Sequence, residues 1–169
     1  MTVEDGTGLS DSNSYVSVAF ADDYFTSRGV SEWTALETTA KESALIRATD
    51  FVDNCFDWKG QKGTYEQALQ FPRKNLTDKS GYSVVDIPTV LKQAVCEASL
   101  ISSKGTELFM TGEQNGAVTS ERIGDLSFTY DVAQRQKDST IYDTVNYRLR
   151  GLYNDTTKKS ICIGGVNRA

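Results

Sequence analysis

The strongest constraint on the fold is an amphipathic pattern over residues 39–56, which runs directly into an aromatic and basic loop. Its apolar side chains recur at the spacing of one helix face: Ala44, Leu45, Ala48, Phe51, Val52 and Cys55. Such a stripe must be buried, so the sequence predicts a long core helix, and Thr39 with Glu42 fits a capping box at its start. Off this stripe, and expected to be exposed, lie Lys41, Arg47, Asp50 and Asp53.

A second strong helix is predicted over residues 88–103, with Pro88 in its first turn. Its broad apolar face consists of Val90, Leu91, Ala94, Val95, Ala98 and Ile101. The alanines would let a neighbouring helix approach closely, so we expect the two long helices to pack together as the core. Shorter amphipathic helices are predicted over residues 18–28, with Ser17 as the N-cap, and over residues 139–153.

A β-hairpin is predicted over residues 117–130, because alternating segments flank the turn dipeptide Gly124-Asp125. The resulting fold class is mainly α, a small helical bundle with a hairpin and extended termini, and α+β overall. Residues 1–153 are expected to form one domain and residues 154–169 a C-terminal extension. The polar, glycine-rich residues 1–13 are expected to be loosely held unless a partner orders them.

The ionisable composition excludes several classes of protein. The chain has 23 acidic and 18 basic residues and no histidine, for a net charge of −5. An acidic molecule repels polyanions on average, which disfavours a protein that coats DNA. Without histidine or a CxxC pair a zinc site is not expected, and no nucleotide-binding or catalytic motif is present. We therefore predict no enzyme activity, no metal or other cofactor, and no membrane span.

Residues 57–86 form a connection of about thirty residues without periodicity, far longer than the ~12–15 residues usual for loops without a function. Basic and aromatic residues interleave in it, as single-stranded DNA binding requires. The candidates for such binding are Trp58, Lys59, Lys62, Phe71 and Lys74. A packed loop with rings inward and lysines outward has the same composition, so both interpretations stay open.

The C-terminal extension contains a short apolar triplet, Ile161-Cys162-Ile163, after a polar linker. It could form a third strand on the hairpin. It could also add as a strand to another chain, in which case backbone hydrogen bonds would supply affinity.

Several short segments form a characteristic series in order along the chain: Met1-Thr-Val-Glu-Asp-Gly-Thr-Gly8, Asn13-Ser-Tyr-Val-Ser-Val18, Ala21-Asp-Asp-Tyr-Phe25, Ala44-Leu-Ile-Arg-Ala-Thr-Asp50, Gln67-Ala-Leu-Gln-Phe-Pro-Arg73, Ile87-Pro-Thr-Val90 and Ala94-Val-Cys-Glu97. This series resembles a family of tailed-bacteriophage proteins known as head–tail connectors or as DnaT-like single-stranded-DNA-binding proteins. They cover most of residues 1–105.

The resemblance implies a virion protein at the head–tail junction, present in the host cytoplasm during assembly. As an adaptor it would form a homo-oligomeric ring, expected to be a dodecamer, below the portal protein. The ring would join tail or further connector proteins, and genome DNA would pass through its lumen without specific binding. The residues expected to contact partners are Ile161, Cys162, Ile163, Trp58 and Arg73. The alternative is a single-stranded-DNA-binding protein of phage replication, which the acidic charge disfavours.

Overall fold

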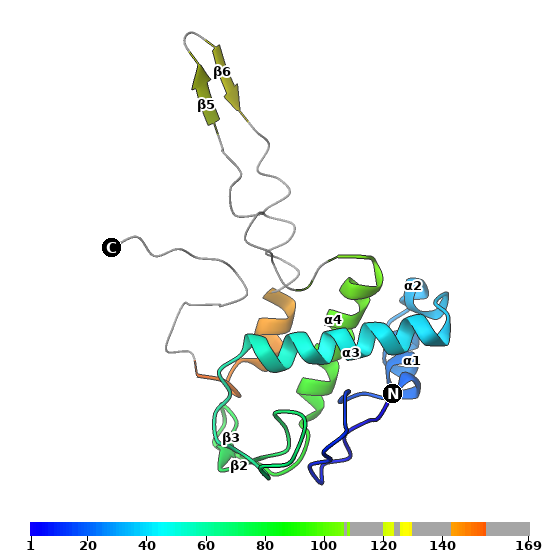
Figure 1. The fold of residues 1–169 in the computed structure, drawn as a ribbon, viewed down its shortest axis with the longest axis vertical. Helices are drawn as coiled ribbons and strands as arrows, with labels where there is room; N and C mark the ends of the chain where they lie inside the picture. The colour runs from blue at the N-terminus through cyan, green and yellow to red at the C-terminus, as the bar shows by residue number, and fades with distance from the viewer. Residues whose placement is uncertain (107, 109–119, 124–125, 130–142, 155–169) are drawn as a thin grey trace.

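Two long helices that pack against each other form the centre of the molecule, α3 (Thr38–Cys55) and α4 (Thr89–Ser103) (Figure 1). This computed structural model describes residues 1–106, 108, 120–123, 126–129 and 143–154. The predicted stripe of α3 is buried except for the half-buried Cys55, and the alanines of α4 at positions 94 and 98 are buried as well. The predicted core pairing of the two helices is therefore confirmed. Their starts differ slightly from the prediction, and Glu37 rather than Thr39 is the N-cap of α3, without a side-chain capping bond.

Two short helices close one end of this pair, α1 (Val18–Thr26) and α2 (Ser31–Thr34). Ser17 caps α1 as predicted, with its hydroxyl accepting a hydrogen bond from the Phe20 N–H at 3.2 Å. The indole N–H of Trp33 donates to Asp22 at 2.8 Å, and Lys41 forms an ion pair with the same carboxylate at 3.0 Å. Lys41 is thus buried, and the prediction that it is exposed is wrong, because an acid on another helix neutralises it.

Within the residues that the structure describes, the strands form three separate antiparallel pairs. The predicted hairpin is confirmed as β5 (Ser120–Ile123) and β6 (Leu126–Thr129), with Ile123 opposite Leu126. The long connection contains two smaller pairs: β1 (Gln61–Lys62) with β2 (Arg73–Lys74), and β3 (Leu76–Thr77) with β4 (Ser83–Val84). The fold class is α+β and mostly helical, as predicted.

The N-terminal segment is folded, contrary to the expectation that it is loosely held. Glu4 is only 2% exposed, and its carboxylate accepts hydrogen bonds from the N–H groups of Gly6, Gly8 and Leu9 at 2.8–3.0 Å. The Ser12 hydroxyl donates to it at 2.9 Å. One carboxylate therefore organises a glycine-containing loop, because it satisfies four donors within eight residues of itself.

A final helical segment, residues 143–149, packs its buried Val145 and Leu149 into the core. It ends earlier than predicted, in a turn at Gly151, whose φ of +103° suits glycine. The chain then pairs with the start of the long connection, where an isolated bridge joins Trp58 to Tyr153. Residues 155–169, which hold the predicted extension, lie outside the described residues. Over the described ranges no helix is long and apolar enough to cross a membrane.

Candidate functional site

The connection between α3 and α4, which in the structure covers residues 57–87 and is thus one residue longer than predicted, is held together by Arg73. Its guanidinium donates Nε–H to the carbonyl oxygen of Lys59 at 2.7 Å and Nη2–H to those of Trp58 and Gly60 at 3.3 and 3.0 Å. The Nη1–H group reaches both the main-chain and the side-chain oxygen of Gln70, at 3.2 and 3.0 Å. Burial lowers the pKa of Arg73, which is only 8% exposed, yet a guanidinium stays protonated in proteins. The side chain therefore ties the start of the connection to its middle.

A second network joins this connection to α3 and to the N-terminal segment. The Tyr15 hydroxyl donates to Asp53 Oδ1 at 2.5 Å and accepts the Phe71 N–H at 3.0 Å. Asp53 Oδ2 accepts the Gln70 N–H at 3.0 Å. Asp53 was predicted to be exposed, and it is instead engaged by two donors because the connection folds back over the end of α3.

Burial dominates the ionisation of this network. It raises the pKa of Asp53 from 3.8 to about 6, against the lowering effect of the hydrogen bonds from Tyr15 and Gln70 and of the charge on Lys62. Burial, followed by the charge of Asp53, raises the pKa of the Tyr15 hydroxyl far above its usual value of 10. The Asp53 carboxyl is thus the group in this site whose charge changes in mildly acidic solution.

We predict that the free energy of unfolding depends on pH through Asp53. A carboxyl whose pKa is higher in the folded state holds its proton more tightly there, so its contribution is greatest below pH 4 and is lost as the pH rises through 6. A shift of about two pKa units corresponds to roughly 3 kcal/mol. Urea denaturation of wild type and Asp53→Asn at pH 4 to 7 measures this, since the variant should lack that part of the pH dependence.

Asp23→Asn is the matched control for this prediction, because it removes an exposed carboxylate from α1. It separates the loss of the partly buried Asp53 carboxyl from the loss of a negative charge as such. If Asp53→Asn and Asp23→Asn behave alike between pH 4 and 7, Asp53 does not titrate in the folded protein as stated.

The predicted binding residues of this connection differ in their exposure. Phe71 is fully buried and Trp58 is 6% exposed, with ring centroids 4.9 Å apart in an edge-to-face contact. Lys59 and Lys62 are half-buried, and their ammonium groups donate to the carbonyl oxygens of Gly151 and Gln67 at 2.9 and 3.2 Å. A base could not stack on either ring without opening the loop.

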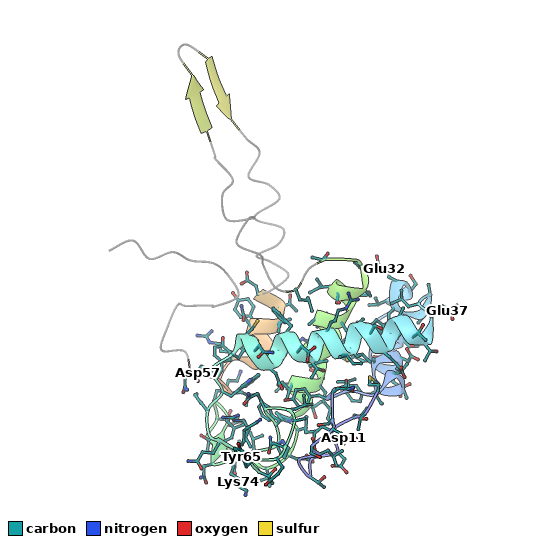
Figure 2. The ribbon with its side chains drawn as sticks, in the orientation of Figure 1. Asp11, Glu32, Glu37, Asp57, Tyr65 and Lys74 are labelled. Carbon is teal, nitrogen blue, oxygen red and sulfur yellow. The ribbon has the colours of Figure 1, made fainter. Side chains whose placement is uncertain are left out.

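Of the predicted DNA-binding set, Lys74 alone is exposed, and Figure 2 labels it in the lower part of the view, away from Glu37 at the start of α3. The partner-binding candidates Trp58 and Arg73 are buried, with their described contacts inside the chain. Ile161, Cys162 and Ile163 lie outside the described residues. The structure thus brings together Trp58, Phe71 and Arg73 as a packed centre, with Lys74 on its surface.

The exposed apolar residues of this region are different ones, which the candidate lists omitted. Tyr65 is 95% exposed, Val85 81% and Tyr82 74%. Large side chains this exposed are a recognised feature of interaction sites when they gather in one region. Composition alone could not separate them from Trp58 and Phe71. Tyr65 follows Gly63 and Thr64, and Tyr82 follows Ser80 and Gly81. These turn-forming neighbours are the sequence feature that could have indicated that both tyrosines are exposed.

The charges at this end of the molecule are predominantly acidic. The exposed cations of the connection are Lys74 and Lys79. The exposed carboxylates of the connection and of the N-terminal loop packed on it are Asp5, Asp11, Asp57, Glu66 and Asp86. This surface therefore combines exposed aromatic rings with a net negative charge from its exposed side chains. The negative charge favours binding of a protein partner over binding of a phosphate backbone.

No reactive group emerges elsewhere in the described part of the chain. Burial raises the pKa of the Cys96 thiol to about 12, so this buried cysteine is a poor nucleophile at neutral pH. Within the same ranges no three His, Cys, Asp or Glu side chains are placed to hold a metal ion. A cluster between helices links Tyr24, Glu97 and Arg148, with the Tyr24 hydroxyl and Arg148 Nη2 both donating to Glu97 Oε1, at 2.6 and 2.9 Å. It fixes the final helix on α1 and α4.

Comparison with known proteins identifies a family for the chain. A family model described as "Putative DnaT-like ssDNA binding protein" matches residues 1–168. The chain belongs to this family. The match extends over both the N-terminal loop and the connection of residues 57–87, so the site described above is part of what the DnaT-like family model covers. No curated protein and no solved structure matches the chain.

Proposed function

We propose that this DnaT-like family member is a structural protein of the phage virion, a head–tail adaptor that works through protein–protein contacts. The observation that carries this proposal is the surface of the connection, where exposed Tyr65, Tyr82 and Val85 lie among carboxylates while the predicted DNA-stacking rings are buried. The role is non-enzymatic and requires no cofactor. The phage setting comes from the resemblance of residues 1–105 to connector proteins.

In this role the helical body is a subunit of a homo-oligomeric ring, expected to be a dodecamer, between the portal protein and tail or further connector proteins. Closed rings require head-to-tail interfaces in which one face of a subunit complements another. A surface of exposed rings on a rigid loop, together with the acidic net charge of −5, supports contacts to protein and passage of genome DNA without specific binding.

The test is the location of the protein in purified particles. We expect cryo-electron microscopy of mature particles to show it as a ring at the head–tail junction, and particles made without it to lack tails. Truncation after Thr156 should abolish attachment to portal-bearing capsids and leave the helical body folded, as judged by circular dichroism. Particles that contain no copy of the protein would contradict the adaptor proposal.

A second candidate function is single-stranded-DNA binding in replication, which is the activity that the family description names. Exposed Tyr65 and Tyr82 with Lys74 and Lys79 on the same connection are the observation that favours it. It requires salt-sensitive binding to an oligo(dT) strand, measured by fluorescence anisotropy. Absence of binding at low salt would exclude this function for the free protein.

A further inference from the structure

Among the described residues, the most exposed ring is that of Tyr65, in a segment that contacts the N-terminal loop. The carbonyl oxygen of Leu9 accepts the Ala68 N–H at 2.9 Å, and Gly8 lies against Thr64, next to Tyr65. On the other side of this loop, Gly6 approaches Asp86 so closely that a Cβ atom on it would lie 2.3 Å from the carboxylate. The N-terminal loop therefore bridges the segment that carries Tyr65 and the segment that carries Val85 and Asp86.

The segment that carries Tyr65 and the N-terminal loop beside it are held in place before any partner arrives. The Gln67 side chain accepts the Thr64 N–H at 2.8 Å and donates to the carbonyl oxygens of Leu69 and Pro72 at 2.8 and 3.2 Å. Glu4 fixes the N-terminal loop through the four donors described above. A pre-ordered surface loses little conformational entropy on binding, so its exposed rings and charges can contribute to affinity.

We propose that this surface binds a protein surface that presents arginine side chains. We call it the Tyr65 face, and its residues are Asp5, Asp11, Tyr65, Glu66, Val85 and Asp86. This inference rests on the proposed adaptor function and specifies the chemistry of the partner.

Arginine is the side chain that fits both features of the Tyr65 face. Its planar guanidinium stacks on an exposed tyrosine ring and forms paired hydrogen bonds with carboxylates. Tyr65 is 95% exposed and is followed directly by the exposed Glu66, with Asp5, Asp11 and Asp86 on the adjoining loops. The exposed carboxylates here outnumber the exposed cations of the connection, Lys74 and Lys79, so the net charge disfavours phosphates and favours a protein partner.

The first test is cross-linking with the full chain in phage-producing cells. Tyr65 is replaced by the photoreactive residue p-benzoylphenylalanine, and the cross-linked peptides are identified by mass spectrometry. The expected product is a segment of another virion protein that contains arginine. Cross-links to nucleic acid, or to protein segments without basic residues, would overturn the inference.

The second test measures binding to portal-bearing capsids by co-sedimentation over a range of salt. The variant Asp11→Lys/Glu66→Lys should bind at least about tenfold more weakly and lose most of its salt dependence. Neither carboxylate has a hydrogen bond to another side chain among the residues that the structure describes, so the fold should tolerate both changes. Glu37→Lys is the matched control, because it reverses the charge of an exposed acid outside the Tyr65 face, which Figure 2 labels at the start of α3, away from Tyr65.

The outcomes separate this inference from the adaptor function. A ring at the head–tail junction with unchanged capsid binding by the double variant would leave the adaptor function standing and disprove the role of the Tyr65 face. If the protein is absent from particles but Tyr65 cross-links to an arginine-containing protein segment, the adaptor function is disproved and the role of the Tyr65 face stands.

Discussion

Replacing Arg73 with methionine is expected to lower the free energy of unfolding by about 4 kcal/mol, because buried acceptors lose a charged donor. Four main-chain carbonyl oxygens, those of Trp58, Lys59, Gly60 and Gln70, accept hydrogen bonds from this one guanidinium. Methionine fills a similar volume and supplies no donor. Urea denaturation of the full chain, followed by tryptophan fluorescence, measures the effect.

Two further variants separate the hydrogen bonds of Arg73 from its charge. Lys74→Met removes a cation from the next position, where the side chain is exposed, and should change the free energy of unfolding by no more than about 0.5 kcal/mol. Arg73→Lys keeps the charge, but the lysine ammonium group cannot replace the planar set of donors of the guanidinium. This variant should therefore recover only part of the free energy of unfolding that Arg73→Met loses. If Arg73→Met and Lys74→Met cost the same, the fork of hydrogen bonds does not stabilise the loop.

This role of Arg73 changes how the connection of residues 57–87 can serve a partner. In the described structure the guanidinium is directed at carbonyl oxygens within the chain, so its contribution to binding is to hold the surface on which Tyr65 is displayed. Substitution of Arg73 would then weaken partner binding through loss of loop order. Substitution of Tyr65 would weaken binding with the fold intact, and comparison of the two separates structure from recognition.

The helical part of the fold could be predicted because its cause is local in the sequence. Two patterns predict both that the helices form and which of their faces pack together: the apolar repeat from Ala44 to Cys55 and the alanines of α4. The hairpin over residues 120–129 was equally predictable from alternation around Gly124-Asp125. The predicted helix starts were less accurate. The sequence indicates a capping box that begins at Thr39, whereas the N-cap of α3 is Glu37.

The arrangement of the connection could not be predicted, because its contacts join residues that are far apart in sequence. The Tyr15 hydroxyl meets Asp53 across 38 positions and Phe71 across 56. Most acceptors of Arg73 are main-chain oxygens, which every residue possesses and which leave no pattern in the sequence. The same holds for Glu4, whose donors are mainly backbone N–H groups.

For the candidate site, the sequence pointed to the segment but could not tell which of its rings are exposed. Aromatic content marked residues 57–86 as a connection with a function, yet Trp58 and Phe71 are packed while Tyr65 and Tyr82 are exposed. The direction of a ring depends on the fold of the whole loop. Within such a loop, a tyrosine next to glycine and polar residues is a better candidate for the surface than tryptophan or phenylalanine, since its hydroxyl tolerates water.

Replacing Phe71 with alanine is expected to destabilise the protein by about 3 to 5 kcal/mol, the usual cost of removing a buried aromatic side chain. The ring is fully buried and lies edge-to-face against both Trp58, with centroids 4.9 Å apart, and Tyr15, at 6.1 Å. Its loss leaves a cavity between α3, the N-terminal segment and the connection. Thermal and urea denaturation of the full chain measure the effect.

Tyr65→Ala is the matched control for Phe71, because it removes an aromatic ring from the same connection at a position that is 95% exposed. Its free energy of unfolding should stay within about 0.5 kcal/mol of the wild type. Capsid binding should be reduced more by Tyr65→Ala than by Phe71→Ala. The two variants are compared at a temperature at which Phe71→Ala is still folded. If Phe71→Ala retains wild-type stability, the ring does not form part of the core, and the stacking of DNA bases on it would have to be considered again.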